Sequence, residues 1–468
     1  MRKVLFFIAF VCATASAHAQ SFSADDLVHR TIERRAVEVV NWGMPAVNFD
    51  RMLQAAVAAG ASINQIVYWP RLQNWRNQTL TPNPDVIYVM PFFSTKEAGP
   101  MVLEIPAANG GSVTGTIMDS WQSAFEDAGP AGLDKGDGGK YLILPPGYTA
   151  AVPVGYLPLQ SKTYRGYALL RSILKSGSEA DLAQAIAYAK QIKLYPLSLA
   201  ANPPPTVFLD AGDLVFDATI PYDIRFFQSL DRFVQYEPWL DRDRVMIDVL
   251  KSVGIEQGKP FEADASREEL LTSAVREAHA WLDVEFEMLF VPYNKGKQWS
   301  VPVSHDFVET QATYWEKPGV YAVDGRAAYF QLGFSTVKHL GQGQFYLFTI
   351  HDGEGKPLDG GASYRLSVPA KAPARQYWSA TVYDRQTHAV IRSMPRLSLS
   401  SQSPGLQTNA DGSVDVYFGA KAPPGKQSNW IPTDPSGRFE VAFRLYGPEQ
   451  SLFDKTWVLP DIARAAAQ

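Results

Sequence analysis

Acidic side chains that follow predicted strands are the groups in this sequence best placed to do chemistry. Asp85 lies where a proline-rich segment enters a strand, Asp119 follows the strand-like run 112–118, and Asp384 ends the run that starts at Tyr377. Paired carboxyl groups can act as general acid and base on a glycosidic or ester bond. Asp85, Asp119 and Asp384 are therefore the candidate catalytic residues.

Aromatic and basic side chains occur close to these carboxylates in the sequence. Aromatic rings cover the apolar faces of sugars, and polar groups beside them bind hydroxyls. The candidate substrate-binding residues are Tyr88, Trp121, Trp378, Arg396 and Trp430. Polar residues in recurrent motifs also hold loops by bonding backbone groups, so a structural role is the alternative reading of this polar set.

The motifs of several common enzyme classes are missing. The sequence contains no Gly-x-Ser-x-Gly, His-Glu-x-x-His or Cys-x-x-Cys motif. His305-Asp306 and His351-Asp352 are adjacent pairs, and adjacent side chains on a strand point to opposite faces. We therefore predict no metal site, and the sequence leaves any cofactor open. The glycine-rich run 352–361 is interpreted as a hairpin turn rather than a calcium loop.

The N-terminus has the pattern of a secretory signal peptide. Arg2 and Lys3 precede a short apolar core, and Ala17 and Ala19 fit the small-residue rule for cleavage before Gln20. The only cysteine, Cys12, would be removed with this segment. We predict a protein of the periplasm or the exterior, without disulfides.

Composition narrows the class of partner. Hydrophobic residues make up 46% of the chain and charged residues 19%, as in packed globular proteins. Without residues 1–19 the chain has 41 basic against 48 acidic residues and no basic cluster, which argues against nucleic acid. No later run is long and apolar enough for a membrane span. We expect a small-molecule or glycan ligand, and the oligomeric state is open.

Residue patterns divide the chain into alternating helical and β regions. We predict a signal peptide over 1–19, a helical segment over 20–79, a first β domain over 80–160, a helical middle region over 161–300 and a C-terminal β-sandwich over 301–468. Helix starts are expected at Ser23, Asn48, Ser178 and Ser266. The alternation over 439–445 predicts a half-solvated strand. The expected class is multi-domain α+β, with two antiparallel, jelly-roll-like sandwiches joined and flanked by helices.

Ordered motifs connect the chain to two known families. The C-terminal motifs are 364–368, Tyr377-Trp-Ser-Ala-Thr-Val-Tyr-Asp384, 395–398, 409–414, Asn429-Trp-Ile-Pro432 and Arg444-Leu-Tyr-Gly-Pro448. In this order they resemble domain of unknown function 1214. The earlier motifs Asn83-Pro-Asp85, 99–106 and 138–148 resemble its usual partner, domain of unknown function 1254.

The resemblance implies paired jelly-roll-like domains in exported bacterial proteins, and it implies no agreed activity. Val86 departs from the pattern, because family members more often have Thr at this place. Three functions follow from the residues: a hydrolase or lyase acting on a small molecule or glycan in an inter-domain cleft, a non-catalytic glycan or ligand binder, and a structural envelope protein. The length of the chain slightly favours the enzyme.

Overall fold

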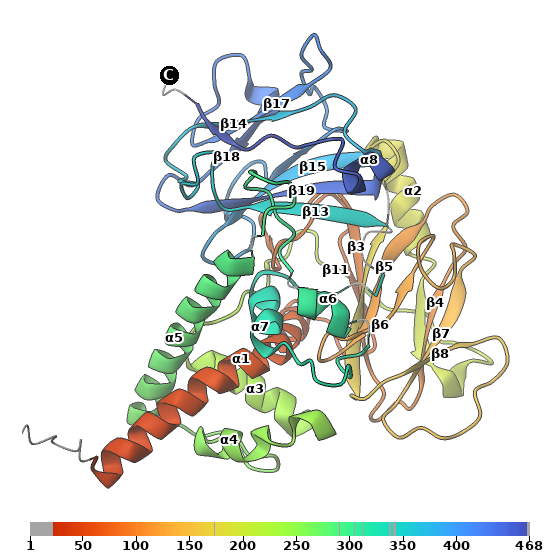
Figure 1. The fold of residues 1–468 in the computed structure, drawn as a ribbon. Helices are drawn as coiled ribbons and strands as arrows, with labels where there is room; N and C mark the ends of the chain where they lie inside the picture. Colours follow the sequence, from red (N-terminus) through yellow and green to blue (C-terminus); the bar gives the residue numbers. More distant parts are fainter. Residues whose placement is uncertain are drawn as a thin grey trace, which may run out of the picture.

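The computed structural model describes residues 22–172, 174–289, 291–303, 305–311, 313–336, 338–339 and 343–465. The predicted signal peptide and its cleavage site before Gln20 lie outside these residues. Figure 1 shows two β-rich parts, one formed by the early strands and one by the late strands, with a group of helices beside them. The expected mixed α+β, multi-domain class is confirmed. The jelly-roll connectivity stays a prediction.

The elements follow one another in helical and β groups. The helices are α1 (Ala24–Ala58), α2 (Glu179–Ala189), α3 (Ile224–Tyr236), α4 (Met246–Ser252), α5 (Ala265–Leu289), α6 (His305–Gln311), α7 (Val323–Leu332) and α8 (Gln450–Phe453). The early strands are β1 (Ile66–Tyr68), β2 (Asn77–Gln78), β3 (Ile87–Ser94), β4 (Met101–Ile105), β5 (Val113–Asp119), β6 (Ala124–Ala128), β7 (Gly139–Leu144), β8 (Leu157–Gln160), β9 (Arg165–Ser172), β10 (Lys193–Pro196), β11 (Phe208–Asp210) and β12 (Phe216–Asp217). The late strands are β13 (Gln344–Thr349), β14 (Tyr364–Val368), β15 (Ala374–Asp384), β16 (Ser398–Ser400), β17 (Val414–Gly419), β18 (Trp430–Pro432), β19 (Phe439–Pro448) and β20 (Ala463–Arg464).

The early strands form two main sheets that share a hydrophobic core. One sheet has the order β11-β1-β3-β9-β5-β6 and the other the order β10-β4-β7-β8. Alternate residues of β3 and β9, such as Val89 and Leu170, pack with Leu103 and Ile143 of the second sheet. Most neighbouring strands are antiparallel, but β1 pairs with β11 and β7 with β8 in parallel. This period-two burial leaves the other face of β3 and β9 for the helices.

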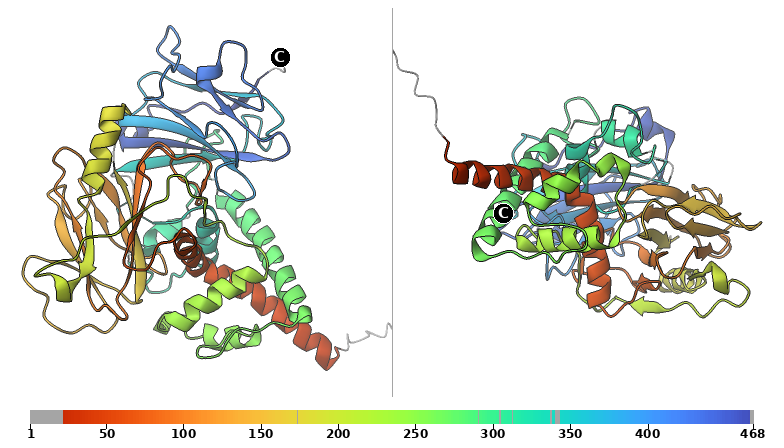
Figure 2. Two further views of the ribbon diagram at one scale, coloured as in Figure 1. Left: turned by 180° about the vertical axis from the view of Figure 1, so that it is seen from behind. Right: turned by 90° about the horizontal axis from the view of Figure 1, so that it is seen from below.

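The helices cover that second face. Phe92 of β3 and Tyr167 of β9 belong to the same core cluster as buried residues of α1, α3, α5 and α7. Figure 2 shows that α1 changes direction along its length, and Pro45 lies inside it. Proline lacks the N–H that the helix needs and clashes with the preceding turn, so a bend at this position is expected.

The late strands also form two sheets with a common core. Their orders are β13-β19-β15-β16 and β18-β17-β14-β20. Val382 of β15 and Phe443 of β19 pack with Leu366 of β14 and Val416 of β17. The opposite face of the β13-β19-β15 sheet is turned to the first β part, because Tyr377 and Tyr446 belong to the core cluster of α1, β3 and β9.

Local helix signals give mixed results. Ser23 and Ser178 cap α1 and α2 as predicted, and their side chains accept hydrogen bonds from the N–H groups of Asp26 and Asp181. The prediction of a second helix starting at Asn48 is wrong. Asn48 lies inside α1, and its amide nitrogen bonds to the carbonyls of Phe330 and Gly333, so tertiary contacts satisfy it.

Three further expectations need correction. α5 begins two residues earlier than expected, at Ala265, and Asp264, not Ser266, accepts the hydrogen bond from the N–H of Arg267. β19 is buried along its whole length rather than half-solvated, because both of its faces are covered. The run 352–361 does contain a tight antiparallel turn, in which His351 is bridged to Pro357 and the N–H of Asp352 donates to the carbonyl of Lys356. The turn does not join β13 and β14 into one hairpin, since β13 pairs with β19 whereas β14 pairs with β17 in the other sheet.

Candidate functional site

A small cavity lies where the two β parts and α7 meet. Its volume is about 120 Å³. The cavity is lined by Thr81, Arg171, Val301, Pro302, Val303, Tyr329, Leu332, Gly333, Phe334, Ser335, Gln344, Phe345, Tyr346 and Phe348. Arg171 comes from β9, Gln344 to Phe348 come from β13, and Tyr329 to Leu332 end α7. The cavity therefore exists only because both β parts are present in one chain.

Arg171 is the charged group in this lining. Its side chain is 8% exposed, its Nε has no hydrogen-bond partner, and its guanidinium carbon lies 5.4 Å from the centre of the Tyr88 ring. No carboxylate among the described residues forms an ion pair with it. Buried charges are ordinarily paired, because an isolated ion loses its hydration. The Oε1 atom of Gln344 in the same lining is also buried without a partner.

A cluster of buried hydroxyls adjoins the cavity. The hydroxyl of Tyr346, which lines the cavity, lies 3.3 Å from that of Tyr446. The side-chain amide of Asn83 donates to the hydroxyls of Tyr446 and Tyr377 at 2.8 and 3.0 Å, and the backbone N–H of Asn83 donates to the hydroxyl of Tyr88 at 2.9 Å. Burial raises the pKa of Tyr377 and of Tyr446, so both stay neutral donors at physiological pH.

Arg444 and Asp85 complete this polar region. Arg444 donates to the hydroxyl of Thr381 at 3.0 Å and to the carbonyl of Thr81 at 2.9 Å. Asp85 accepts a hydrogen bond of 2.9 Å from Ser398, and its other carboxyl oxygen is buried without a partner. Burial raises the pKa of Asp85 to about 6, although the Ser398 bond and the charge of Arg444 act against the shift.

Backbone strain marks two of the lining residues. Thr81 has a φ of 39° and Ser335 a φ of 87°, both in the left-handed region that favours glycine. For a β-branched residue such as Thr81 this conformation is an outlier. The hydroxyl of Thr81 donates to the carbonyl of Leu332 at 2.9 Å, which holds the strained residue against the end of α7. Such strain gathers at ligand sites and active sites.

The structure brings only some of the sequence-predicted residues together. Asp85 and Tyr88 lie in the region of Asn83 and Arg444 described above. Asp119 and Trp121 lie in a different cluster: Asp119 accepts hydrogen bonds from the N–H of Ser123 and the hydroxyl of Tyr314. Burial raises the pKa of Asp119 against these two bonds. Trp121 is buried in the helix-facing core, with the Arg326 guanidinium over its ring.

The other four predicted residues have contacts within the C-terminal part. Asp384 accepts from the N–H groups of Gln386 and Thr387 in the turn after β15. Trp378 is 7% exposed and stacks on Phe443.

Arg396 and Trp430 both bond to backbone carbonyls. Arg396 donates to the carbonyls of Gln427, Ser428 and Trp430, and the Trp430 indole donates to the carbonyl of Gly419. None of Asp384, Trp378, Arg396 and Trp430 lines the cavity.

Sequence reasoning missed Arg171 and Arg444. The signal for Arg171 was present in the run Arg165-Gly-Tyr-Ala-Leu-Leu-Arg171, because period two places two arginines, Tyr167 and Leu169 on one face. Arginine side chains that share a buried strand face with apolar side chains indicate an internal site rather than a solvent-exposed surface. Arg444 was assigned to a solvated face, which the burial of β19 excludes.

Metal binding finds no support in the described residues. Within these ranges no three His, Cys, Asp or Glu side chains come close enough to share an ion. Among the same residues, no helix is both long and apolar enough to cross a bilayer.

A known structure shares the fold at low sequence identity. The crystal structure of the VPA0106 protein from Vibrio parahaemolyticus matches 93% of this chain and 100% of its own, with 16% identity and a TM-score of 0.55. A crystal structure of an uncharacterised protein from Burkholderia cenocepacia matches 94% of each chain, with 11% identity and a TM-score of 0.42. The search of curated proteins found no match.

Family profiles agree with the motifs read from the sequence. Residues 63–196 match the family described as DUF1254, and residues 343–450 match the protein family of unknown function DUF1214. Arg171 lies in the first match and Tyr346 in the second, so the cavity is shared by both. The chain therefore belongs to the proteins that combine a DUF1254 domain with a DUF1214 domain.

Proposed function

We propose that this protein binds a small organic anion with an apolar body in the cavity between its DUF1254 and DUF1214 domains. The observation that carries the proposal is Arg171, a buried cation that lines the cavity without an anionic partner among the described residues. A bound carboxylate would supply the missing negative charge. Arginine is well suited to this role because its planar fork matches a carboxylate with two parallel hydrogen bonds.

The protonation state of Arg171 supports anion binding. Burial lowers the pKa of its guanidinium, but the surrounding hydroxyls of Tyr346, Tyr88 and Tyr446 outweigh burial and raise it. Arg171 therefore keeps its positive charge throughout the physiological range. In a medium of low dielectric constant, this charge attracts an anion far more strongly than a surface arginine would.

The size and lining of the cavity restrict the rest of the ligand. A dry cavity of about 150 Å³ holds a benzene ring, and the present cavity has about 120 Å³. Leu332, Phe334, Phe345 and Phe348 give it apolar walls. The volume suits a carboxylate with a short alkyl chain, such as butyrate, better than the larger benzoate, and it is too small for an oligosaccharide.

A hydrolase or lyase acting on such an anion is the second candidate. The observation that favours it is the Asp85 carboxyl, whose pKa of about 6 would allow proton exchange near neutral pH. The hydrogen bonds that lead from the cavity through Tyr346, Tyr446 and Asn83 reach the backbone N–H of Asp85, not its carboxyl. None of the described lining residues carries a carboxylate, so ligand binding is the better-supported function. We place this function in the periplasm or outside the cell, on the pattern of residues 1–19.

A thermal-shift screen tests the binding proposal. The probes are benzoate and butyrate, each compared with its uncharged amide. A ligand at 100 times its dissociation constant stabilises the folded state by about 2.7 kcal/mol. We expect at least one carboxylate to raise the melting temperature of the wild type, its amide to have no effect, and Arg171→Met to abolish the response. Equal responses in wild type and Arg171→Met, or none from either acid, would refute the proposal.

A further inference from the structure

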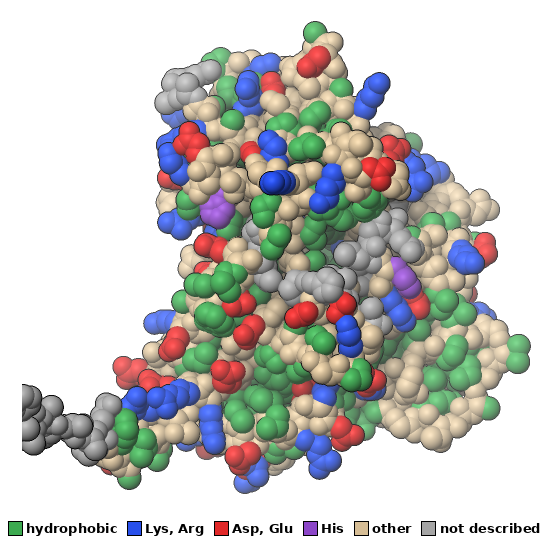
Figure 3. Space-filling model, in the orientation of Figure 1, with side chains coloured by type: hydrophobic (Ala, Val, Ile, Leu, Met, Phe, Trp, Pro, Cys, Tyr) green, Lys and Arg blue, Asp and Glu red, His purple; other side chains and the backbone are tan. Residues whose placement is uncertain are grey.

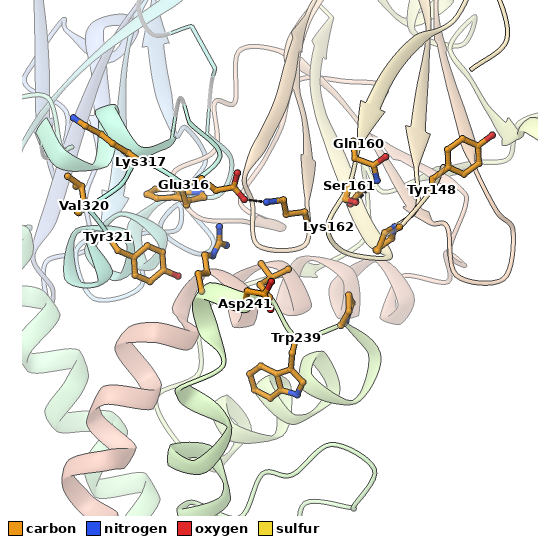
Figure 4. A pocket seen from close by; sticks show the side chains of 17 residues that line it. Tyr148, Gln160, Ser161, Lys162, Trp239, Asp241, Glu316, Lys317, Val320 and Tyr321 are labelled. Carbon is orange, nitrogen blue, oxygen red and sulfur yellow. Dashed lines mark hydrogen bonds and ion pairs between the residues drawn. The ribbon is translucent and has the colours of Figure 1, made fainter. Parts of the chain in front are cut away.

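We infer that a second, open cleft on the DUF1254 side of the molecule binds carbohydrate without net charge. The cleft has a volume of about 1120 Å³. Four segments line it: residues 146–148 and 160–162 from the first β part, residues 238–242 after α3, and residues 315–317 with 319–321 before α7. Figure 4 shows side chains from these segments facing a common space. The lining residues differ from those of the Arg171 cavity, so the two proposals are independent.

Aromatic rings stand on different walls of the cleft. Tyr148, Trp239 and Tyr321 line it and are partly exposed, and Figure 4 shows them around the space rather than stacked on each other. The Trp239 ring is held from behind by Trp42, with ring centres 6.3 Å apart and planes at 17°. A rigid, half-exposed ring costs little entropy when it covers a ligand, and it matches the apolar face of a sugar.

The charged groups of the cleft compensate one another. Lys162 forms an ion pair with Glu316 across the cleft, as the dashed line in Figure 4 shows. The remaining lining charges also have partners: Arg242 pairs with Asp243, Lys317 with Glu309 and Asp241 with Arg244. On the face in Figure 3, acidic and basic side chains are interspersed as well. The described lining has three basic and two acidic residues, and with the partners Asp243, Glu309 and Arg244 the positive and negative charges are equal in number. The cleft is therefore not built for a polyanion.

Polar groups remain available to a ligand despite this pairing. Gln160 adds an amide to the lining. Paired charges beside an exposed amide and aromatic rings are what a polyhydroxylated, uncharged ligand requires, because hydroxyls both donate and accept. The volume exceeds that of a usual small-molecule pocket, so a chain of several sugar rings fits.

Contacts behind the cleft explain why its walls are fixed. Arg242 donates to the carbonyl of Tyr314 at 3.1 Å, and the hydroxyl of Tyr314 donates to Asp119. The Arg326 guanidinium lies 4.6 Å from the centre of the Trp315 ring and 5.1 Å from that of Tyr321. Asp119 thus acts on this cleft as a positioning residue.

A glycan array of uncharged and acidic oligosaccharides tests the inference, followed by titration calorimetry with the strongest binder. We expect wild type to bind uncharged oligosaccharides, and Trp239→Ala and Tyr148→Ala each to weaken binding at least tenfold. Tyr148 lies in a loop, so Tyr148→Ala still tests the inference if Trp239→Ala fails to fold. The matched control is Trp281→Ala, which removes a 39% exposed ring of α5 outside the cleft and should leave binding unchanged.

The outcomes separate this inference from the proposed function. An array without bound sugars overturns it, as does equal binding by wild type, Trp239→Ala and Tyr148→Ala. Binding limited to sulfated or uronic sugars also overturns it, because the cleft would then recognise charge. Arg171→Met should bind sugars like wild type, whatever the result of the carboxylate screen.

Discussion

The side-chain amide of Asn83 donates a hydrogen bond of 2.8 Å to the hydroxyl of Tyr446, 363 residues further along the chain. Asn83 belongs to the Asn-Pro-Asp motif of the DUF1254 domain, and Tyr446 to the Arg-Leu-Tyr-Gly-Pro motif of the DUF1214 domain. Two motifs that identify separate families are therefore in direct contact. The buried contact gives a physical reason for the two domains to occur together.

Asn83→Ala tests whether this contact holds the two domains together. The substitution removes the donor to two buried tyrosine hydroxyls, at Tyr377 and Tyr446. Leaving buried polar groups unsatisfied costs about 1–3 kcal/mol each. We expect the free energy of unfolding in urea to fall by about 2–4 kcal/mol. Asn409→Ala is the control, because Asn409 bonds within an exposed turn. A loss no larger than that of the control would contradict this reading.

Elements governed by neighbours in the sequence were predicted well. The caps at Ser23 and Ser178 depend on an N–H three residues away, which the sequence contains. Asn48 has the same residue type as a good cap, but its partners are Phe330 and Gly333, and Gln122 also donates to it at 2.8 Å. Local propensity is a weak guide when distant backbone groups satisfy a side chain.

The candidate site was harder to predict because it depends on the contact between domains. Asp85 and Tyr88 were recognised from their place at the start of a strand, and both lie in the polar region beside the cavity. The alternation over 439–445 predicted that Arg444 lies on a solvent-exposed face of its strand. A period of two shows that one face of a strand is polar, but it does not show what covers that face. The sheet of β13, β19 and β15 turns that face towards Thr81 of the first β part, and Arg444 also donates to the hydroxyl of Tyr383 on the same sheet.

Arg165 and Arg171 offer a matched pair on one strand. Arg165 forms a buried ion pair of 2.8 Å with Glu237, whereas Arg171 has no carboxylate partner among the described residues. Arg165→Met leaves Glu237 buried without a cation, which should destabilise the protein by about 3–5 kcal/mol. Arg171→Met removes an uncompensated charge, so its stability should stay within about 1 kcal/mol of wild type or rise.

Urea unfolding of both variants in the absence of added ligand gives the comparison. A large loss for Arg171→Met would indicate that its charge is structural, which would count against a binding role. Arg165→Met with unchanged stability would show that buried pairing on β9 contributes little.

Processing at the N-terminus is a prediction that rests on the sequence alone. Ala17 and Ala19 are the small residues expected before a cleavage site, so we expect the exported protein to begin at Gln20. Mass spectrometry of the intact exported protein measures this directly. Retention of Met1 or Cys12 would contradict the prediction, and Ala19→Arg should block processing and serve as the control.

Stability should depend on pH through Asp85. Burial raises the pKa of this carboxyl from 3.8 to about 6 in the folded state. Between these values the folded protein holds a proton that the unfolded chain has released. The contribution to stability is therefore complete below the lower value and is lost as the pH rises through about 6. A shift of about two pKa units corresponds to about 3 kcal/mol.

Asp85→Asn removes this titration. Relative to wild type, the variant should gain stability as the pH rises from about 4 to about 8, with most of the change between about pH 4 and pH 6. Urea unfolding across that range measures the difference. Ser398→Ala provides a further test, because the hydrogen bond from the Ser398 hydroxyl lowers the pKa of Asp85. Without this hydroxyl the pKa of Asp85 should be higher, so the pH-dependent loss of stability should occur at a higher pH. A difference between Asp85→Asn and wild type that does not vary with pH would show that Asp85 is ionised in the folded protein, and its proposed part in proton exchange would fail.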